Sequence, residues 1–146
     1  MKLHVRSAVE ADIPRLAAIE KEFSDNSWSE DQLKNELSLA HAILFCCEAD
    51  GELAGFCDLH VVADDAHINE ICVAPRHRRL GCAHALMHHA IGLCREMHCA
   101  ALTLEVRSKN EPAVQLYEKC GFRLCGERKR FYHAPDDDAL CMLMQF

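Results

Sequence analysis

The stretch RHRRLGCAHALM, residues 76–87, restricts the fold of this chain more than any other segment. Three of its first four residues are arginine, and a helical pattern begins after Gly81. Cations are unfavourable at a helix start, because the N-terminal end of the helix dipole is already positive. A bound anion reverses this, since a glycine turn and a first helical turn point several N–H groups into one small volume. The segment predicts a strand, a turn and a helix around an anion site; an ordinary solvated turn is the alternative.

The common nucleotide motifs do not explain this anion. The chain contains neither G-x-x-x-x-G-K followed by Ser or Thr nor G-x-G-x-x-G, so a P-loop and a dinucleotide-binding fold are not supported. The 23 acidic and 16 basic residues give a net charge of −7, whereas nucleic-acid binding requires a basic surface. We therefore expect no direct nucleic-acid partner.

Length and hydropathy indicate one domain outside the membrane. A chain of 146 residues, taken as one domain over residues 1–146, is long enough to bury a sizeable core. No unbroken apolar run is longer than the six residues of Ala42 to Cys47, far fewer than a membrane span needs. The first residues contain no apolar segment of the kind found in secretion signals. We expect a cytoplasmic protein with no membrane partner.

The spacing of cysteine and histidine does not predict a metal site. Ten cysteines are present, none of them in a C-x-x-C pair, and we interpret them as buried small hydrophobic side chains in a reducing compartment. His84 and His88 have a spacing that can bind a metal ion, but they lie on the polar face of a predicted helix. A solvated helix face is the simpler interpretation, and we expect no metal.

Periodicity and turn signals predict the order strand–helix–helix–strand–strand–strand–helix–strand–helix–strand–strand. Ser29–Gln32 has a capping-box pattern, Asp12 precedes a helix as an N-cap, and Asp50–Gly51 predicts a hairpin. The last two strands are expected around residues 123–127 and 139–145. A strand–helix–strand unit near the end implies a parallel pair, whereas hairpins imply antiparallel neighbours. The fold class is therefore α+β, with a mixed central sheet of about seven strands flanked by about four helices.

Two longer motifs resemble those of the GNAT N-acetyltransferases. The first, V-x-P-x-x-R/Q-x-x-G-x-G/A between a strand and a helix, matches Val73, Pro75, Arg78, Gly81 and Ala83. The second, N-x-x-A-x-x-L-Y-x-x-x-G-F after a strand, matches Asn110, Ala113, Leu116, Tyr117, Gly121 and Phe122. The segments WSEDQL, LEVRSKN and RFYHAPDDDALCM further resemble the RimI branch, the ribosomal-protein N-terminal alanine acetyltransferases. The likeness covers nearly the whole chain and implies the GNAT fold.

By this resemblance the anion is the pyrophosphate of coenzyme A, and acetyl-CoA is the cosubstrate. The strand before the turn pairs with the pantetheine arm, and the turn and the helix start bind the pyrophosphate. The cofactor-binding residues that the resemblance implies are Ile71, Cys72, Val73, Arg78, Arg79, Leu80, Gly81, Cys82, Ala83, His84 and Asn110.

Acetyl transfer from a thioester requires a neutral amine, a stabilised oxyanion and a proton for the leaving thiolate. The pKa of an α-amine is about 8 and that of lysine about 10.4, so deprotonation near pH ~7.4 costs under about 1 kcal/mol and roughly 4 kcal/mol, respectively. A modest base is therefore enough for protein N-termini. By the resemblance, Glu105 is that base, directly or through water, and Tyr117 is the acid. An N–H group around Cys72 and Val73 polarises the carbonyl oxygen.

Each of these roles has an alternative. Glu105 could simply end a strand or pair with Arg107, and Tyr117 could simply pack in the core. Glu70 is a rival base or a substrate-binding residue. Cys82 is not expected to act as a nucleophile, because the turn faces the pyrophosphate rather than the thioester.

The acceptor is expected in a groove between the early helices and the last hairpin. The substrate-binding residues are Trp28, Glu70 and Tyr132. The acidic run Asp136–Asp138 either attracts a basic peptide or forms a solvated turn. Two positions depart from the branch, since Ser27 replaces a proline and Phe131–Tyr132 replaces a pair of tyrosines.

The resemblance implies transfer of acetyl to the N-terminal alanine of small-subunit ribosomal protein 18, whose N-terminal peptide is then the partner. Acetylation of a small-molecule amine or of another protein N-terminus is the alternative enzymatic function. A non-catalytic acyl-CoA-binding module is the alternative from a different class, although such a module would be expected to lack the acid and the base.

Overall fold

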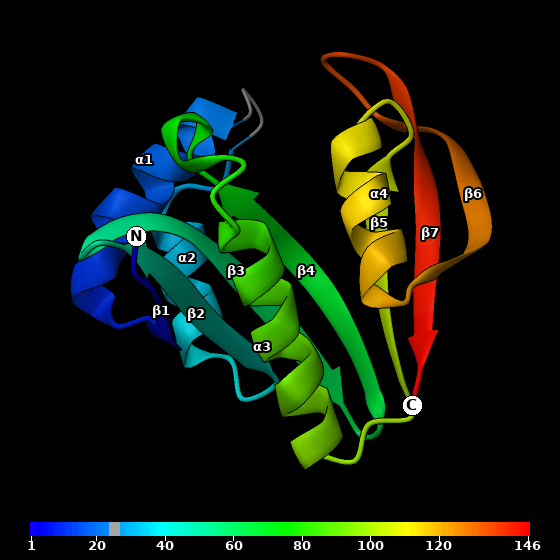
Figure 1. Cartoon of the computed structure of the whole chain (residues 1–146), viewed down its shortest axis with the longest axis horizontal. Coiled ribbons are helices and arrows are strands. Elements are labelled where there is room, and N and C mark those ends of the chain that lie inside the picture. Colours follow the sequence, from blue (N-terminus) through cyan, green and yellow to red (C-terminus); the bar gives the residue numbers. More distant parts are fainter. Residues whose placement is uncertain (24–26) are drawn as a thin grey trace.

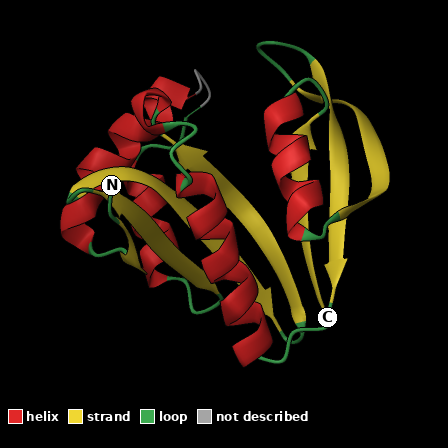
Figure 2. Ribbon diagram, in the orientation of Figure 1, coloured by secondary structure: helices red, strands yellow, loops and turns green. Residues whose placement is uncertain are grey.

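The computed structural model describes residues 1–23 and 27–146, which form seven strands and four α-helices (Figures 1 and 2). The strands are β1 (Leu3–Ser7), β2 (Ala42–Ala49), β3 (Glu52–Val62), β4 (Asp65–Val73), β5 (Ala101–Arg107), β6 (Arg123–Tyr132) and β7 (Asp137–Gln145). The helices are α1 (Ile13–Phe23), α2 (Glu30–Ser38), α3 (Cys82–Glu96) and α4 (Glu111–Cys120), with short 3-10 helices η1 (Glu10–Asp12) and η2 (Pro75–His77). The predicted order of strands and α-helices is confirmed.

The strands form one mixed sheet in the order β1-β2-β3-β4-β5-β7-β6. Every neighbouring pair is antiparallel except β4 and β5, which are parallel and joined through α3. Helices α1 and α2 pack on one face of β2, β3 and β4, and α3 packs on the other face, the side on which α4 lies against β5 and β7 (Figure 1). The predicted α+β fold class is confirmed.

The sheet separates two hydrophobic clusters, one under α3 and α4 and the other under α1 and α2. The adjacent Cys46 and Cys47 on β2 are both 0% exposed, and each belongs to a different cluster, because successive strand residues point to opposite faces. All ten cysteines, which lie within the described residues, are free, and seven are buried. These seven are the small core residues predicted, whereas Cys125 on β6 is exposed.

The predicted hairpin turn and the predicted capping box both depend on residues that are close together in the chain, and both are confirmed. Asp50 and Gly51 have φ angles of 50° and 83° and turn β2 into β3. Ser29 Oγ accepts a hydrogen bond from Gln32 N at 3.2 Å, and Gln32 Oε1 accepts one from Ser29 N at 2.8 Å, which confirms the capping box. His84 and His88 lie on the exposed face of α3, as expected. Within the described residues, no helix has the length and apolar character needed to cross a membrane.

The two strands predicted for the last hairpin were too short. Strand β6 extends to Tyr132 and β7 begins at Asp137. Most of β6 is exposed, and it carries the charged run Glu127–Arg130. Charged residues are typical of an edge strand, and they obscure the period-2 pattern by which the strand end would be recognised.

The role predicted for Asp12 also differs. Asp12 directly precedes α1, but its carboxylate accepts a hydrogen bond from Val9 N at 2.8 Å and two from the Arg6 guanidinium at 2.8 and 3.0 Å. The hydrogen bond from Arg6 is the main cause that lowers the pKa of Asp12 below its ordinary value of 3.8. The side chain therefore ties β1 to the η1 turn rather than capping α1 alone.

We predict that Asp12→Asn lowers the free energy of unfolding near neutral pH by about 1–3 kcal/mol, because the partly buried Arg6 guanidinium loses the nearer of its two carboxylate partners and keeps only Glu48. A carboxyl group whose pKa is lowered on folding stabilises the fold above its unfolded pKa, and this contribution is lost as the pH falls through the folded pKa. Urea unfolding should therefore show a difference between the two proteins that shrinks below about pH 4. Asp64→Asn, a substitution in an exposed turn, is the control. An equal loss of unfolding free energy in this variant contradicts the prediction.

Candidate active site

Strands β4 and β5 pair along only part of their length. The parallel pairing joins residues 65–67 to residues 101–103 and then stops, and the two strands diverge toward their C-terminal ends (Figure 1). Ala74 N donates to Ala54 O at 2.7 Å, so by alternation the N–H group of Cys72 points to β3, whereas those of Ile71 and Val73 point toward β5. Among the described strands, none pairs with this part of the β4 edge.

A β-bulge in β4 lies where this pairing ends. Asp58 on β3 is opposite Glu70 and Leu59 is opposite Ile68, which leaves Asn69 as an extra residue in β4. A bulge bends its strand and increases the local twist. Asn69 Nδ2 donates to Asp58 Oδ2 at 3.2 Å and so holds the bulge against β3.

The turn after β4 has the geometry of an anion site. Arg79 and Gly81 both have positive φ angles, 62° and 90°, which are left-handed conformations that glycine adopts without strain. Helix α3 makes its first internal hydrogen bond from Ala85 N to Gly81 O at 2.9 Å. The N–H groups of residues 82–84 precede this bond and have no acceptor within the helix.

The three arginines of this turn do not share one role. Arg76 forms an ion pair with Glu52 at the start of β3, and His77 Nε2 lies 3.8 Å from the same carboxylate. The charge of Arg76 is therefore paired with that of Glu52. The positive charge next to the α3 N-terminus comes from Arg78 and Arg79, and Leu80 between them and the helix is 41% exposed.

Two of the residues predicted to bind the cofactor have side chains that are engaged within the protein. Cys82 is 1% exposed, and burial raises the pKa of its thiol, so only its backbone is available to an anion and a nucleophilic role is not supported. Asn110 is the N-cap of α4, and its Oδ1 accepts a hydrogen bond from Ala113 N at 3.4 Å. Ala83 and His84 lie in the first turn of α3.

Tyr117 and Tyr132 come from different elements to the same region near the diverging strands. Tyr117 on α4 is 6% exposed; burial is the main cause that raises its pKa, followed by Cys57 and Glu70. Burial also raises the pKa of Tyr132 to about 12, with Glu105 as the next cause. The structure thus gathers Glu70, Glu105, Tyr117 and Tyr132 in one region, although they lie on four elements.

Glu105 points away from the core that holds its neighbours on β5. Its side chain is 21% exposed, and Arg128 Nε lies 3.5 Å from its Oε2. The alternative partner Arg107 is engaged elsewhere: it donates to Pro135 O at 2.7 Å, and its guanidinium lies 4.4 Å from the centre of the Tyr132 ring. Arg128, on the edge strand, was not identified from the sequence.

Glu70 has a second carboxyl group beside it that the sequence did not reveal. Glu20 on α1 is 1% exposed, and its Oε2 has no hydrogen-bond partner among the described residues. Burial, followed by Glu20, raises the pKa of Glu70 to about 9. Glu70 Oε1 also accepts a hydrogen bond from Ile71 N at 3.2 Å. Because residues 20 and 70 are far apart in sequence, only the packing of α1 on β4 brings them together.

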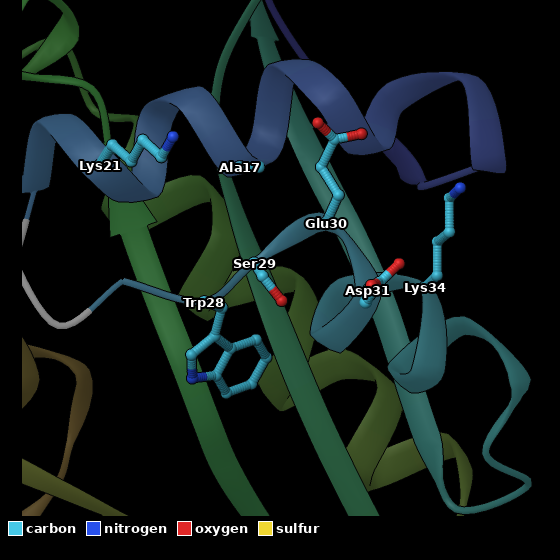
Figure 3. Close-up of a pocket in the computed structure, with 7 residues that line it drawn as sticks. All are labelled: Ala17, Lys21, Trp28, Ser29, Glu30, Asp31 and Lys34. Carbon is cyan, nitrogen blue, oxygen red and sulfur yellow. The ribbon is translucent and has the colours of Figure 1, made fainter.

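Trp28 lies between two hollows next to α2. The first, of about 260 Å³, is lined by Trp28, Gln32, Asn35 and Glu36. The second, of about 450 Å³, is lined by Ala17, Lys21, Trp28, Ser29, Glu30, Asp31 and Lys34. Figure 3 shows that in this second hollow the Trp28 indole points away from α1, whereas Glu30 and Lys34 point toward it.

The acidic run at the last hairpin is mostly occupied by its own loop. Asp137 accepts hydrogen bonds from the Ser108 hydroxyl and from Lys109 N, and Asp138 accepts one from Arg130 N. The expectation that these carboxylates attract a basic peptide is therefore not supported, because only the Asp136 side chain remains largely exposed, at 86%.

The sequence profile of the acetyltransferase (GNAT) family matches residues 13–122. This range includes β4, the glycine turn, α3, β5 and α4, which carry the arrangement described above. The chain belongs to the GNAT acetyltransferase family and is an acetyl-CoA-dependent N-acetyltransferase.

Individual members of the family show which kinds of acetyltransferase this chain is similar to. A Bacillus subtilis (strain 168) protein, provisionally named a ribosomal protein bS18-alanine N-acetyltransferase, is 37% identical over 97% of this chain and 94% of its own length. The crystal structure of the ribosomal-protein-S18-alanine N-acetyltransferase from Escherichia coli superposes with a TM-score of 0.91 at 29% identity, covering 99% of this chain and 94% of the other. A streptothricin acetyltransferase from Streptomyces lavendulae is 35% identical over 91% of this chain and 74% of its own length.

We predict that Gly81→Glu abolishes binding of coenzyme A. The substitution imposes a left-handed φ of 90° on a residue with a side chain, and it adds a negative charge at the predicted pyrophosphate site. Titration calorimetry should show no measurable heat for this variant, and wild-type affinity that falls with added salt. Gly92→Glu, in open space on the same helix, is the control and should retain binding. Unchanged affinity in Gly81→Glu would remove the anion-site assignment.

Proposed function

We propose that this enzyme acetylates the N-terminal α-amine of a protein, and that its substrate is the N-terminal alanine of ribosomal protein bS18 in the cytoplasm. The observation that supports this most is the gathering of Glu70, Glu105, Tyr117 and Tyr132 beside the unpaired edge of β4. The names of the B. subtilis and E. coli relatives support the choice of acceptor.

Backbone groups supply most of the proposed binding site for acetyl-CoA. When bound, acetyl-CoA supplies the thioester whose acetyl group is transferred. The turn fits its pyrophosphate, because Arg78, Arg79 and the N–H groups at the start of α3 all carry positive charge or partial charge. Of the two expected donors to the carbonyl oxygen, Val73 is the better one, since alternation along the strand directs the Cys72 N–H group to β3.

Glu105 is the proposed base, rather than Glu70. With a pKa raised to about 9, Glu70 is largely protonated near neutral pH and cannot accept a proton from the amine. Glu105 is partly exposed, so a water molecule can reach it and carry the proton from the acceptor. Glu70 is then a neutral group that lines the amine site.

Tyr117 is the proposed acid. Its raised pKa keeps the phenol protonated throughout the neutral range, so its O–H group is able to donate to the leaving sulfur. Tyr117 belongs to the hydrophobic cluster under α3 and α4, and Glu70 and Tyr132 also contribute to its raised pKa. The presence of this residue together with Glu105 argues against a non-catalytic acyl-CoA-binding module.

A small-molecule amine is the second candidate acceptor. The similarity to the streptothricin acetyltransferase supports it. An N-terminal amine remains the better fit to the chemistry, since its low pKa requires only the modest base that a partly exposed glutamate provides.

We predict that Glu105→Gln lowers kcat most strongly at low pH, where the amine is protonated and the base matters most, and leaves the affinity for coenzyme A nearly unchanged. Tyr117→Phe should lower kcat at similar affinity, by about 100–10,000-fold. Steady-state kinetics between about pH 6 and pH 9 measures both, with Glu70→Gln as the comparison. If the first two variants keep wild-type rates and Glu70→Gln lowers kcat, the base is Glu70 rather than Glu105.

We predict that a peptide beginning with Ala followed by basic residues is acetylated faster than free lysine or a polyamine. The reason is that a lysine amine requires roughly 4 kcal/mol to deprotonate near neutral pH, against under about 1 kcal/mol for an α-amine. Competition assays followed by mass spectrometry decide this, and the N-terminally blocked peptide, which should be inert, is the control. Label on a lysine side chain of the blocked peptide, or preference for the polyamine, contradicts N-terminal specificity.

A further inference from the structure

Three side chains outside the proposed chemistry meet between α2 and the sheet. Asp58 on β3 is 0% exposed and Glu36 on α2 is 9% exposed. His60 Nε2 lies 2.5 Å from Glu36 Oε1 and 3.1 Å from Asp58 Oδ2. Glu36, Asp58 and His60 are called the α2 acid cluster below.

The α2 acid cluster has more carboxyl oxygens than donors. Among the described residues, Asp58 Oδ1 is buried and receives no hydrogen bond. A carboxyl oxygen of Glu36 lies within 4.8 Å of one of Asp58. Burial, followed by Glu36, raises the pKa of Asp58 to about 7, so this carboxyl group is partly protonated near neutral pH. A cationic ligand is able to replace that proton.

The positive charge around the α2 acid cluster is also too small to neutralise both of its carboxylates. Within residues 1–23 and 27–146, His60 is the only basic side chain bonded to either carboxyl group. One imidazole neutralises at most one of two carboxylates. Buried charge without a partner is unfavourable, so the cluster is electrostatically suited to one additional cation.

The cluster opens to the surface through the hollow beside Trp28. Glu36 lines this hollow of about 260 Å³ together with Trp28, Gln32 and Asn35. A guanidinium group stacks favourably on an indole ring and forms bidentate hydrogen bonds to a carboxylate. The hollow therefore combines the two groups that recognise an arginine or lysine side chain.

The α2 acid cluster, whose ligand atoms lie within 4.8 Å of one another, is one strand away from the proposed amine site. Asp58 lies directly opposite Glu70 in the β3–β4 register, and neighbouring strands are about 4.8 Å apart. Successive Cα atoms of a peptide are about 3.8 Å apart. An acceptor with its N-terminus beside Glu70 therefore brings the side chain of its second residue within reach of Glu36.

We propose that the α2 acid cluster and the hollow beside Trp28 form a specificity subsite for a basic side chain at the second position of the acceptor. This inference rests on the proposed N-terminal acetylation. A metal ion is a poorer occupant, although the three ligand atoms lie within 4.8 Å of one another, because the hollow is much larger than an ion and is lined by an indole that does not ligate metals.

Two peptides that differ only at the second residue, Ala-Arg and Ala-Gln, test the subsite. The wild-type enzyme should prefer Ala-Arg by at least about tenfold in kcat/KM, mainly through KM, since a charged hydrogen bond contributes roughly 1.5–3 kcal/mol. Glu36→Gln, which keeps the size of the side chain, should remove this preference and leave kcat/KM for Ala-Gln within about twofold. Asp58→Asn should have the same effect; because Asp58 is fully buried, its folding is checked by thermal unfolding.

Asp31→Asn is the matched control, because it removes a carboxylate from the exposed first turn of the same helix and should retain the preference. Equal rates on the two peptides, or an unchanged preference in Glu36→Gln, overturns the subsite and leaves N-terminal acetylation intact. If neither peptide is acetylated, both the subsite and the proposed N-terminal acetylation are overturned. Loss of the preference on chelation, with recovery on addition of zinc, assigns the cluster to a metal ion instead and also overturns the subsite.

Discussion

The separation of β4 from β5 is the constraint on which the rest of the structure depends. Parallel pairing stops after His67 and Thr103, next to the bulge at Asn69. A fully paired sheet satisfies its backbone groups internally and leaves none for a ligand. Because pairing stops here, the Val73 N–H group has no strand partner among the described residues, whereas that of Ile71 donates to Glu70 Oε1. Tyr117 on one side of the sheet comes close to Glu70, whose half-buried side chain lies beside Glu20 of α1 on the other side.

The two sides of this opening have opposite electrostatic character. The turn before α3 carries arginine residues, and the N–H groups of the first turn of α3 have no acceptor within the helix; both suit an anion. The α1 and α2 side holds three buried carboxyl groups, Glu20, Glu36 and Asp58, and the half-buried Glu70; the pKa values of Asp58 and Glu70 are raised. Buried carboxylates are unfavourable without a cation or a proton. The distribution of charge is thus matched to an anionic cosubstrate on one side and an amine on the other.

The sequence by itself determined the elements and the turns, because these depend on residues that are close together in the chain. Asp50–Gly51 requires positive φ angles, and Ser29–Gln32 satisfies the free N–H groups of a helix start within four residues. The strand, glycine turn and helix around Gly81 follow from the same local physics. These signals, with the family resemblance, were sufficient for the order of elements, the mixed sheet and the class of enzyme.

Only the tertiary structure decided which charged groups meet. Arg76 binds Glu52 instead of an anion, Glu105 lies beside Arg128 rather than its near neighbour in sequence, and Glu20 reaches the amine side from α1. Each of these contacts depends on strand register, on the β4 bulge or on helix packing, which join residues far apart in the chain. A charge pattern read along the sequence contains no distances, and both ion pairing and pKa shifts depend on distance and burial. The residues proposed to select the acceptor are therefore the part of the site that required the folded chain.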